Sequence, residues 1–409
     1  MQDNPYKYTG PLHPSHDKLI CAPRKKELDQ VIGGILRGEY WTILGPRQIG
    51  KTTLLNQLIQ ELTSFTCIHF DMESSPDTEE LFYKLIENTI SENVLRDGFK
   101  IKTDNKGDFG YEINFYNFLL SIDDMRNKKI VLLFDEIERI PVVKSFLKLW
   151  RKIFSERNYH PILNKYAVVI AGSVDLIELT IGKTSPFNIS KKLYLGELSI
   201  SEAEALIDHP MKKLGINIET EAKNEITQLT SCHPQLMQHL CYLLVGKTLN
   251  SHKKIKKAYV KNAIETLYVE SDNLSTLADA IKSDKTLSYL IGKILNGDQV
   301  HYLPYKKYSI AGTGPLIREG QYCKIRNEIF KEFLQSIITL SEENEHQIIY
   351  NYSVIDKKSG IKLTIGVFTL LAGVFAIFSA LSNFSLGFGL AGFFAFIAIM
   401  GAAKYWFFT

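Results

Sequence analysis

The residues with the clearest chemistry lie in one glycine-containing loop near the N-terminus. The loop is Gly45-Pro46-Arg47-Gln48-Ile49-Gly50-Lys51-Thr52 and matches G-x-x-x-x-G-K-[ST]. Its glycines let successive backbone N–H groups turn toward a phosphate, and a following helix N-terminus adds partial positive charge. Lys51 is predicted to reach the β- and γ-phosphates of ATP, and the Thr52 hydroxyl to ligate Mg²⁺. The predicted phosphate-binding segment runs through Thr53.

Two carboxylates complete the predicted chemistry. Asp135 and Glu136 follow the apolar run Ile130–Phe134, as expected of an acid pair at the end of a buried strand. Asp135 is predicted to hold Mg²⁺, directly or through water. Glu136 is predicted to act as the base or to orient the water that converts ATP to ADP and phosphate. The predicted catalytic residues are therefore Lys51 and Glu136, in a slow or regulatory ATPase.

Further polar residues could touch the nucleotide. Ser173 follows another apolar run and is either a sensor of the γ-phosphate or a plain turn serine. Arg47 could contact phosphate or a neighbouring subunit. Arg139, Arg151 and Arg157 could also act on a neighbour, and the sequence selects none of them.

These residues need a parallel sheet to hold them. Strand-like and helix-like patterns alternate through the first ~200 residues, which predicts an α/β P-loop NTPase core. A helix is predicted around residues 28–36 and another around 54–62. Short apolar runs of the kind buried on both faces of a sheet lie at residues 40–44, 66–70, 130–134 and 167–171.

The sequence after about residue 198 predicts further domains. Ser199 and Glu202 have capping-box spacing, and mostly helical patterns follow. Helices and a short strand pair at Leu316-Ile317 and Tyr322–Ile325 suggest a winged helix. The predicted division is the ATPase core 1–197, helical lid 198–268, winged helix 269–338, linker 339–360 and transmembrane hairpin 361–408.

The C-terminal region is unusually apolar. Residues 363–403 contain no Asp, Glu, Lys, Arg or His, and the turn-like residues 382–385 divide them into two stretches. Each stretch is close to the ~20 residues that cross a bilayer, although a buried helical hairpin in a soluble core is the alternative. Lysines flank both ends, and the turn carries no charge. This pattern predicts two spans in the cytoplasmic membrane, with the ATPase domain and the C-terminus both cytoplasmic.

Net charge and cysteine spacing argue against several classes of protein. The formal net charge of +3 excludes binding to nucleic acid by bulk charge alone, although a local patch could bind. The five cysteines have neither C-x-x-C nor zinc-ligand spacing. This argues against a disulfide scaffold or a structural zinc site.

Taken in order, these motifs resemble the bacterial AAA-like domain ATPases of the STAND class (signal-transduction ATPases with numerous domains). The resemblance extends from about residue 20 to about residue 335. It rests on the ordered set Ala22-Pro23-Arg24, Gly38-Glu39-Tyr40, Pro46-Arg47-Gln48, Phe134-Asp135-Glu136, Leu149-Trp150-Arg151, Glu156-Arg157, Ser185-Pro186-Phe187-Asn188-Ile189, His233-Pro234 and Ile325-Arg326-Asn327-Glu328-Ile329.

The resemblance implies that the lid and winged helix clamp ADP in a resting state, and that exchange for ATP permits oligomerisation. It also implies that Arg24, His233 and Pro234 are neighbours of the nucleotide. This chain departs from the family before His233, where Ser231-Cys232 replaces two frequent glycines.

Three functions remain open. The first is a membrane-tethered, ATP-dependent switch that responds to an unknown protein trigger, oligomerises and uses its hairpin to perturb the membrane in bacterial defence or regulated cell death. The second is an ATPase anchored by the hairpin that serves a partner complex. The third is a DNA-binding ATPase of the loader type at the membrane.

Overall fold

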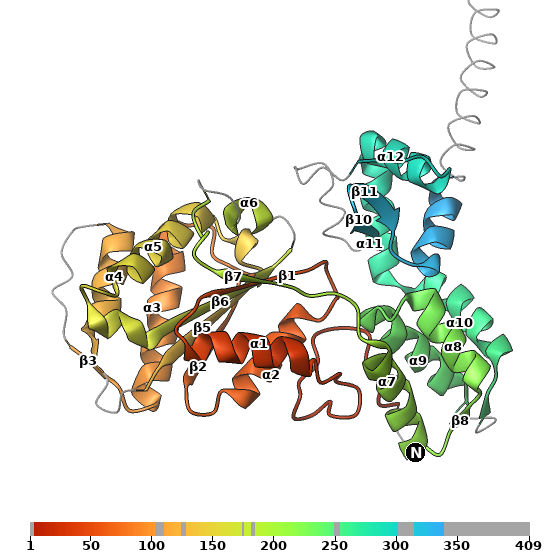
Figure 1. Ribbon diagram of the computed structural model, residues 1–409, viewed down its shortest axis with the longest axis horizontal. Coiled ribbons are helices and arrows are strands. Elements are labelled where there is room, and N and C mark those ends of the chain that lie inside the picture. Colours follow the sequence, from red (N-terminus) through yellow and green to blue (C-terminus); the bar gives the residue numbers. More distant parts are fainter. Residues whose placement is uncertain are drawn as a thin grey trace, which may run out of the picture. The chain divides into compact units, whose positions relative to one another are not determined.

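The computed structural model describes residues 4–102, 110–123, 128–173, 176–180, 185–248, 254–301 and 315–338. Residues 1–338 belong to one compact unit, in which a parallel sheet is followed by a mostly helical part (Figure 1). Within the described ranges, no helix is both long and apolar enough to cross a bilayer. The spans predicted within 363–403 lie outside those ranges.

Five parallel strands of the described chain form the central sheet in the order β2-β5-β6-β1-β7. They are β1 Trp41–Leu44, β2 Thr66–Asp71, β5 Ile130–Asp135, β6 Tyr166–Gly172 and β7 Lys191–Tyr194. β5 and β6 are buried along their whole length because continuous apolar runs suit strands covered on both faces. The α/β core with a parallel sheet is confirmed. β7 was not predicted, because it is an edge strand with only Leu193 buried.

Two apolar layers cover the sheet. One packs α1 and α2 against alternate strand residues such as Ile43 and Leu133. The other packs α3, α4 and α5 against the intervening residues, and includes Phe134 and the fully buried Trp150. The helices of this part are α1 Lys25–Leu36, α2 Lys51–Glu61, α3 Glu79–Arg96, α4 Tyr111–Ser121, α5 Val143–Glu156 and α6 Ile177–Thr180.

The short elements of this part are peripheral to the central sheet. They are the antiparallel pair β3 Lys100–Ile101 and β4 Ile122–Asp123, and the 3₁₀ helices η1 Ile137–Arg139 and η2 Pro161–Lys165. η1 matters for the site because it follows β5 directly and turns the chain back toward the end of β6.

The helical part begins at the capping box predicted from Ser199 and Glu202, which the structure confirms at the start of α7. Its elements are α7 Ile200–Lys213, β8 Asn217–Ile218, α8 Thr220–Thr230, α9 Pro234–Thr248, β9 Lys254–Ile255 and α10 Lys257–Glu270. The short strands β8 and β9 pair in parallel.

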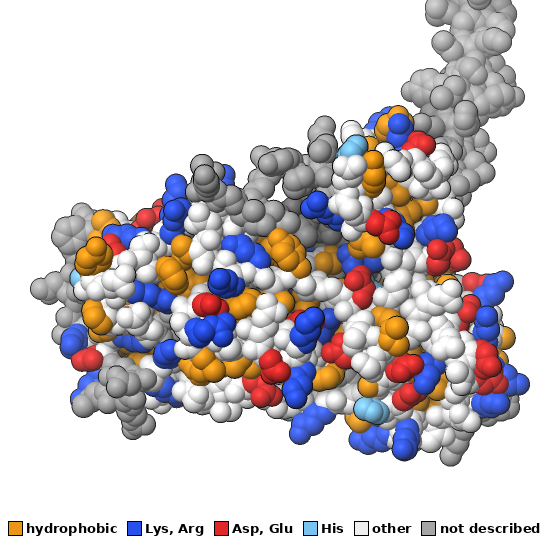
Figure 2. All heavy atoms as spheres, viewed as in Figure 1, with side chains coloured by type: hydrophobic (Ala, Val, Ile, Leu, Met, Phe, Trp, Pro, Cys, Tyr) orange, Lys and Arg blue, Asp and Glu red, His pale blue; other side chains and the backbone are white. Residues whose placement is uncertain are grey.

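Two helices and a strand pair follow. They are α11 Asp272–Ser283, α12 Lys285–Leu295, β10 Leu316–Glu319 and β11 Tyr322–Ile325. The short strand pair was predicted, and the structure pairs β10 and β11 in antiparallel orientation. Residues 328–338 form a helix after it. One apolar cluster joins these elements to α7–α10 and also takes in Tyr6 and Ile20 from the N-terminal segment. On the face drawn in Figure 2, acidic and basic side chains are interspersed.

Candidate nucleotide site

The P-loop occupies the turn between β1 and α2. Gln48 and Gly50 both have positive φ, of 63° and 98°, which curls the backbone ahead of α2. A side chain at Gly45 would place Cβ 2.9 Å from the carbonyl oxygen of Leu195, so this position needs glycine for close packing. Gly50 has open space around it and needs glycine for its backbone conformation. The two glycines of the motif therefore serve different purposes.

Lys51 is folded back over this loop. Its Nζ donates hydrogen bonds to the carbonyl oxygens of Gly45 (3.1 Å) and Pro46 (3.0 Å), and the residue is only 5% exposed. Burial lowers the pKa of Lys51, while the charges of Glu136 and Asp135 oppose that shift. An ammonium group held by neutral carbonyls in a buried site is poised to exchange them for an anion.

Thr52 and Asp135 meet at the end of the sheet. The Thr52 hydroxyl donates to Asp135 Oδ2, and the Glu136 backbone N–H donates to Asp135 Oδ1 (3.0 Å). Burial raises the pKa of Asp135, against the effect of the Thr52 hydrogen bond and the Lys51 charge. Hydroxyl and carboxylate oxygens suit Mg²⁺, which usually completes its shell with substrate phosphates and water. Thr52 and Asp135 supply oxygens of this kind and therefore fit that role. Among the described residues, no group of three or more His, Cys, Asp or Glu forms a candidate metal cluster.

Two glutamates follow Asp135. Glu136 has a left-handed backbone (φ 51°), and burial together with Glu138 raises its pKa. Glu138 Oε1 accepts from the Ser173 backbone N–H (2.7 Å), while its Oε2 is buried without a hydrogen-bond partner. Glu138 was not predicted. Its signal was an acid three residues after Asp135, and only the turn made by η1 brings it to the end of β6.

Ser173 is held at this same edge. It is 8% exposed, and its backbone binds Glu138. A side chain at the preceding Gly172 would place Cβ 2.1 Å from Glu138 Oε2, so this glycine gives Glu138 room. Ser173 is not among the residues that line the adjoining cavity.

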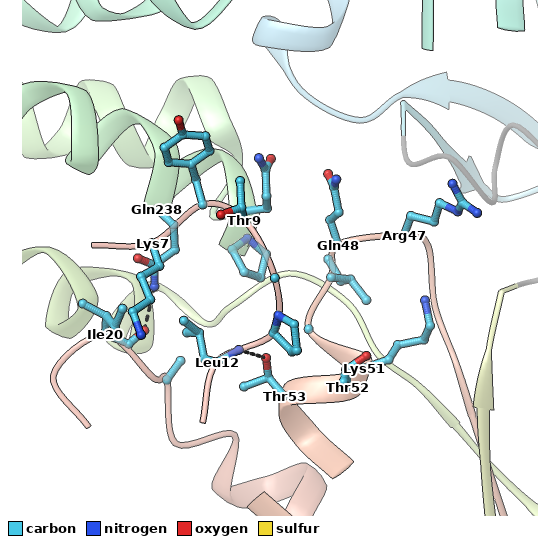
Figure 3. A pocket seen from close by; sticks show the side chains of 18 of the residues that line it. Lys7, Thr9, Leu12, Ile20, Arg47, Gln48, Lys51, Thr52, Thr53 and Gln238 are labelled. Atoms are coloured by element: carbon cyan, nitrogen blue, oxygen red, sulfur yellow. Dashed lines mark hydrogen bonds between the residues drawn. The ribbon is translucent and has the colours of Figure 1, made fainter. Parts of the chain in front are cut away.

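A cavity of about 470 Å³ adjoins these groups. In Figure 3, Lys51 and Thr52 lie on one side, and Gln238 and Ile20 on the other. The predicted site residues that line it are Arg24, Arg47, Gln48, Ile49, Gly50, Lys51, Thr52, Thr53, Asp135, Glu136 and Pro234. The structure thus brings the P-loop, the acid pair and the start of α9 to one cavity.

Comparison with known proteins assigns the family. Residues 24–336 match the AAA-like domain family. The chain belongs to this family. None of the curated proteins matches the sequence.

One solved structure shares the fold of this AAA-like domain, and two further matches have lower TM-scores. A Walker-type ATPase of Pyrococcus abyssi superposes with a TM-score of 0.56 at 14% identity, over 76% of this chain and 95% of its own. The Cdc6p protein of Pyrobaculum aerophilum matches with a TM-score of 0.44 at 16% identity, over 78% and 94%. The RuvB Holliday junction branch migration motor of Thermotoga maritima matches with a TM-score of 0.42 at 16% identity, over 80% and 98%.

Arg24 connects the P-loop of this AAA-like domain to the segment that leads into α7. Its guanidinium donates to the carbonyl oxygens of Ile49 (3.2 Å), Gly196 (2.8 Å) and Glu197 (2.9 Å). Its backbone N–H donates to Glu202 Oε1 (3.0 Å). Arg24 lines the cavity, and these three carbonyls engage its guanidinium. Its contacts hold the P-loop against the segment before α7, and its place beside the nucleotide stays a prediction.

His233 and Pro234, at the start of α9, face different surroundings. Pro234 lines the cavity, whereas His233 is 1% exposed, is not among the lining residues and packs edge-on against Phe330. Both ring nitrogens of His233 are buried without a hydrogen-bond partner. Burial, helped by the charges of Arg326 and Arg24, lowers the pKa of His233 to about 3. The His233 ring thus packs against Phe330 and does not line the cavity, and its place beside the nucleotide stays a prediction.

Ser231 and Cys232, which replace two glycines frequent in the family, have an unusual backbone conformation. Both residues have positive φ, 47° and 59°, a conformation that glycine adopts most easily. The AAA-like domain therefore keeps the backbone path suited to glycine, with side chains that strain it.

The N-terminal segment forms one wall of the cavity, which the sequence did not predict. Its backbone is tied to α2, because Leu12 N–H donates to Thr53 Oγ1 (3.2 Å) and Asn56 Nδ2 donates to Leu12 O (3.1 Å). It is also tied to α7, because the Tyr6 hydroxyl lies 3.1 and 3.0 Å from the carbonyl oxygens of Leu206 and Ile207. The only signal was a cluster of tyrosines and prolines in an otherwise polar segment.

The four arginines that could act on a neighbouring subunit differ in burial and in hydrogen-bond partners. Arg157 is buried, with its guanidinium donating to Gly38 O (2.6 Å) and to Tyr166 O, and stacked over Tyr40. Arg151 donates to Ser185 O (3.2 Å). Arg139 is exposed beside Glu136, and Arg47 is exposed on the loop. Arg139 and Arg47 are thus the two that reach the surface at this site.

Proposed function

We propose that this chain is a membrane-tethered, ATP-dependent switch of the STAND type, and that it hydrolyses ATP slowly. The observation that carries nucleotide binding is the convergence of Lys51, Thr52 and Asp135 on one cavity. A buried cation, a hydroxyl and a buried carboxylate in this order suit a triphosphate with its metal ion. ADP and ATP are the proposed ligands.

The proposed hydrolysis uses the same residues. Water attacks the γ-phosphorus, the bond to the β–γ bridging oxygen breaks, and ADP leaves. Lys51 offsets the negative charge on the phosphate oxygens, and Glu136 orients the water and accepts its proton. Mg²⁺ bound by Thr52 and Asp135 would neutralise the β- and γ-oxygens.

A chain of contacts supports the switch. Arg24 joins the P-loop carbonyl of Ile49 to the backbone of Glu197, and the Glu197 carboxylate pairs with Arg326 after β11. A change in the P-loop backbone on nucleotide exchange is therefore transmitted by direct contacts to the C-terminal elements. In this proposal α11, α12, β10, β11 and the helix at 328–338 act as the winged helix that clamps the resting state.

The membrane part of the proposal rests on the sequence. The uncharged stretch 363–403 supplies two spans of the cytoplasmic membrane, with both chain ends cytoplasmic. After exchange of ADP for ATP in response to a protein trigger, subunits associate and their clustered hairpins perturb the bilayer. Bacterial defence or regulated cell death would use such an effector.

The test measures membrane potential in bacteria that overexpress the full chain, because high concentration favours assembly by mass action. Lys51→Ala removes the buried cation, and Lys148→Ala is the matched control at an exposed lysine of α5. Depolarisation by wild type and Lys148→Ala, but not by Lys51→Ala, is expected. Equal depolarisation by all three would contradict nucleotide control. ATP binding to the purified chain, lost in Lys51→Ala, tests the nucleotide site itself.

A further inference from the structure

The far side of the cavity from Lys51 contains polar groups that the phosphate chemistry does not use. Gln238 and Gln235 of α9 line the cavity and are only 4% and 9% exposed. Gln238 Oε1 and Gln235 Nε2 are both buried without a hydrogen-bond partner. An unsatisfied buried amide group is costly, so a ligand that completes these bonds gains affinity.

The orientation of the Gln238 amide is fixed by its other contact. Its Nε2 donates to the backbone carbonyl oxygen of Ile20 at 2.7 Å, and a carbonyl can only accept. Rotating the amide by 180° would set two oxygens against each other. The group that Gln238 leaves unpaired is therefore an acceptor. No hydrogen bond within the described residues fixes the Gln235 amide, which can rotate to suit its partner.

The surroundings suit a flat heterocycle. Leu198, Leu206 and Ile20 line the same cavity and are almost fully buried. Gln235 and Gln238 are three residues apart on α9, so their side chains lie next to each other on one face. The wall thus offers apolar surface and two adjacent hydrogen-bonding groups, of which one must accept.

We propose that this wall is the base site and that Gln238 makes it selective for adenine by accepting a hydrogen bond from the exocyclic 6-amino group. Gln235 serves the neighbouring ring nitrogen. Hypoxanthine and guanine have an oxygen at position 6, which would face Gln238 Oε1 without a hydrogen between them. The inference rests on the proposed function, since it places the base of the nucleotide whose phosphates Lys51 and Thr52 bind.

A second glutamine provides the comparison. Gln57 of α2 also lines the cavity, donates from Nε2 to Ala22 O (2.7 Å) and leaves Oε1 buried without a partner. It lacks a neighbouring glutamine like that of Gln238, so we assign the base contact to α9. Replacing Gln57 should weaken ATP and ITP binding equally or not at all.

The test uses ATP and ITP, which differ only at the 6-position and the adjacent N1, with the full-length chain in detergent and binding measured by calorimetry. The wild type is expected to bind ATP roughly 10- to 100-fold more tightly than ITP. In Gln238→Met this ratio should approach one, whereas Gln57→Met and the exposed control Gln228→Met should keep it. Lys51→Ala should weaken the binding of both nucleotides and leave the ratio of their affinities unchanged.

The assignment alone would be overturned by equal binding of ATP and ITP by the wild type, or by a ratio that survives Gln238→Met. Loss of the ratio in Gln57→Met would move the contact to α2 and also overturn it. Purine riboside triphosphate tests the same contact in the wild type, because it has only hydrogen at position 6. It should bind more weakly than ATP. Binding of neither ATP nor ITP to the wild type would instead overturn the proposed function, and this inference with it.

Discussion

Arg326 forms an ion pair with Glu197, the residue whose backbone carbonyl accepts a hydrogen bond from Arg24. The Arg326 side chain is 6% exposed and that of Glu197 is 31% exposed, so the pair is largely shielded from water. It links the segment after β11 to the segment between β7 and α7. Because Arg24 also binds the P-loop, Arg24 and Arg326 meet at Glu197 and together connect the nucleotide site to the C-terminal elements.

Breaking this ion pair should destabilise the folded chain. Arg326→Gln is expected to lower the free energy of unfolding by about 2 kcal/mol, because a shielded carboxylate loses its counter-charge. With Glu197→Gln, a double-mutant cycle should give a coupling of about 1 kcal/mol. Urea unfolding followed by tryptophan fluorescence measures both. The exposed pair Lys324–Glu319 is the control, and Lys324→Gln should cost under about 0.5 kcal/mol. Strictly additive effects of the two substitutions would contradict the coupling.

Arg24→Lys should weaken ATP binding about tenfold, although the guanidinium is engaged by protein carbonyls. One ammonium group cannot reproduce the forked contacts to Ile49, Gly196 and Glu197, so the P-loop loses its support. Arg37→Lys, at an exposed arginine of the C-cap of α1, is the matched control. Calorimetric titration with ATP provides the measurement. Unchanged affinity in Arg24→Lys would mean that the P-loop holds its shape without this contact.

The buried His233 should make stability depend on pH. Its pKa is about 3 in the folded chain against 6.5 unfolded, so between these values only the unfolded chain binds the proton. The contribution of His233 to the free energy of unfolding is therefore fully present above pH 6.5. It falls by roughly 1.4 kcal/mol per pH unit below that value. His233→Leu should remove this contribution and reduce the loss between pH 7 and pH 5 by about 2 kcal/mol. Chemical denaturation at the two pH values tests this. The same loss in both proteins would show that His233 does not titrate as expected.

Ser231→Gly should stabilise the chain by about 1 kcal/mol, since glycine adopts the positive φ of this exposed position without strain. Ser231→Ala keeps the Cβ and should give no gain. Thermal unfolding of the two variants beside the wild type distinguishes them. A gain in Ser231→Ala equal to that in Ser231→Gly would rule out relief of backbone strain as its cause.

The strongest local patterns predicted the fold best. β5 and the P-loop each carry their signal within a few adjacent residues, and the structure places Thr52 against Asp135. β7 was missed because an edge strand with two lysines lacks an apolar run. Tyr6 was missed because its partners lie about 200 residues away. The orientation of the His233 ring could not be predicted from its place in the sequence, because packing against Phe330 decides where the ring points.

The N-terminal wall of the cavity has a consequence for synthesis. Residues 6–20 cannot take their place against α7 and α9 until those helices have left the ribosome, and Gln238 must be free to bind the Ile20 carbonyl. Contacts of such long sequence separation form late in folding. The P-loop emerges early, but the cavity is complete only after α7 and α9 have been made. A nascent chain thus becomes able to retain a ligand only after most of its described length has been made.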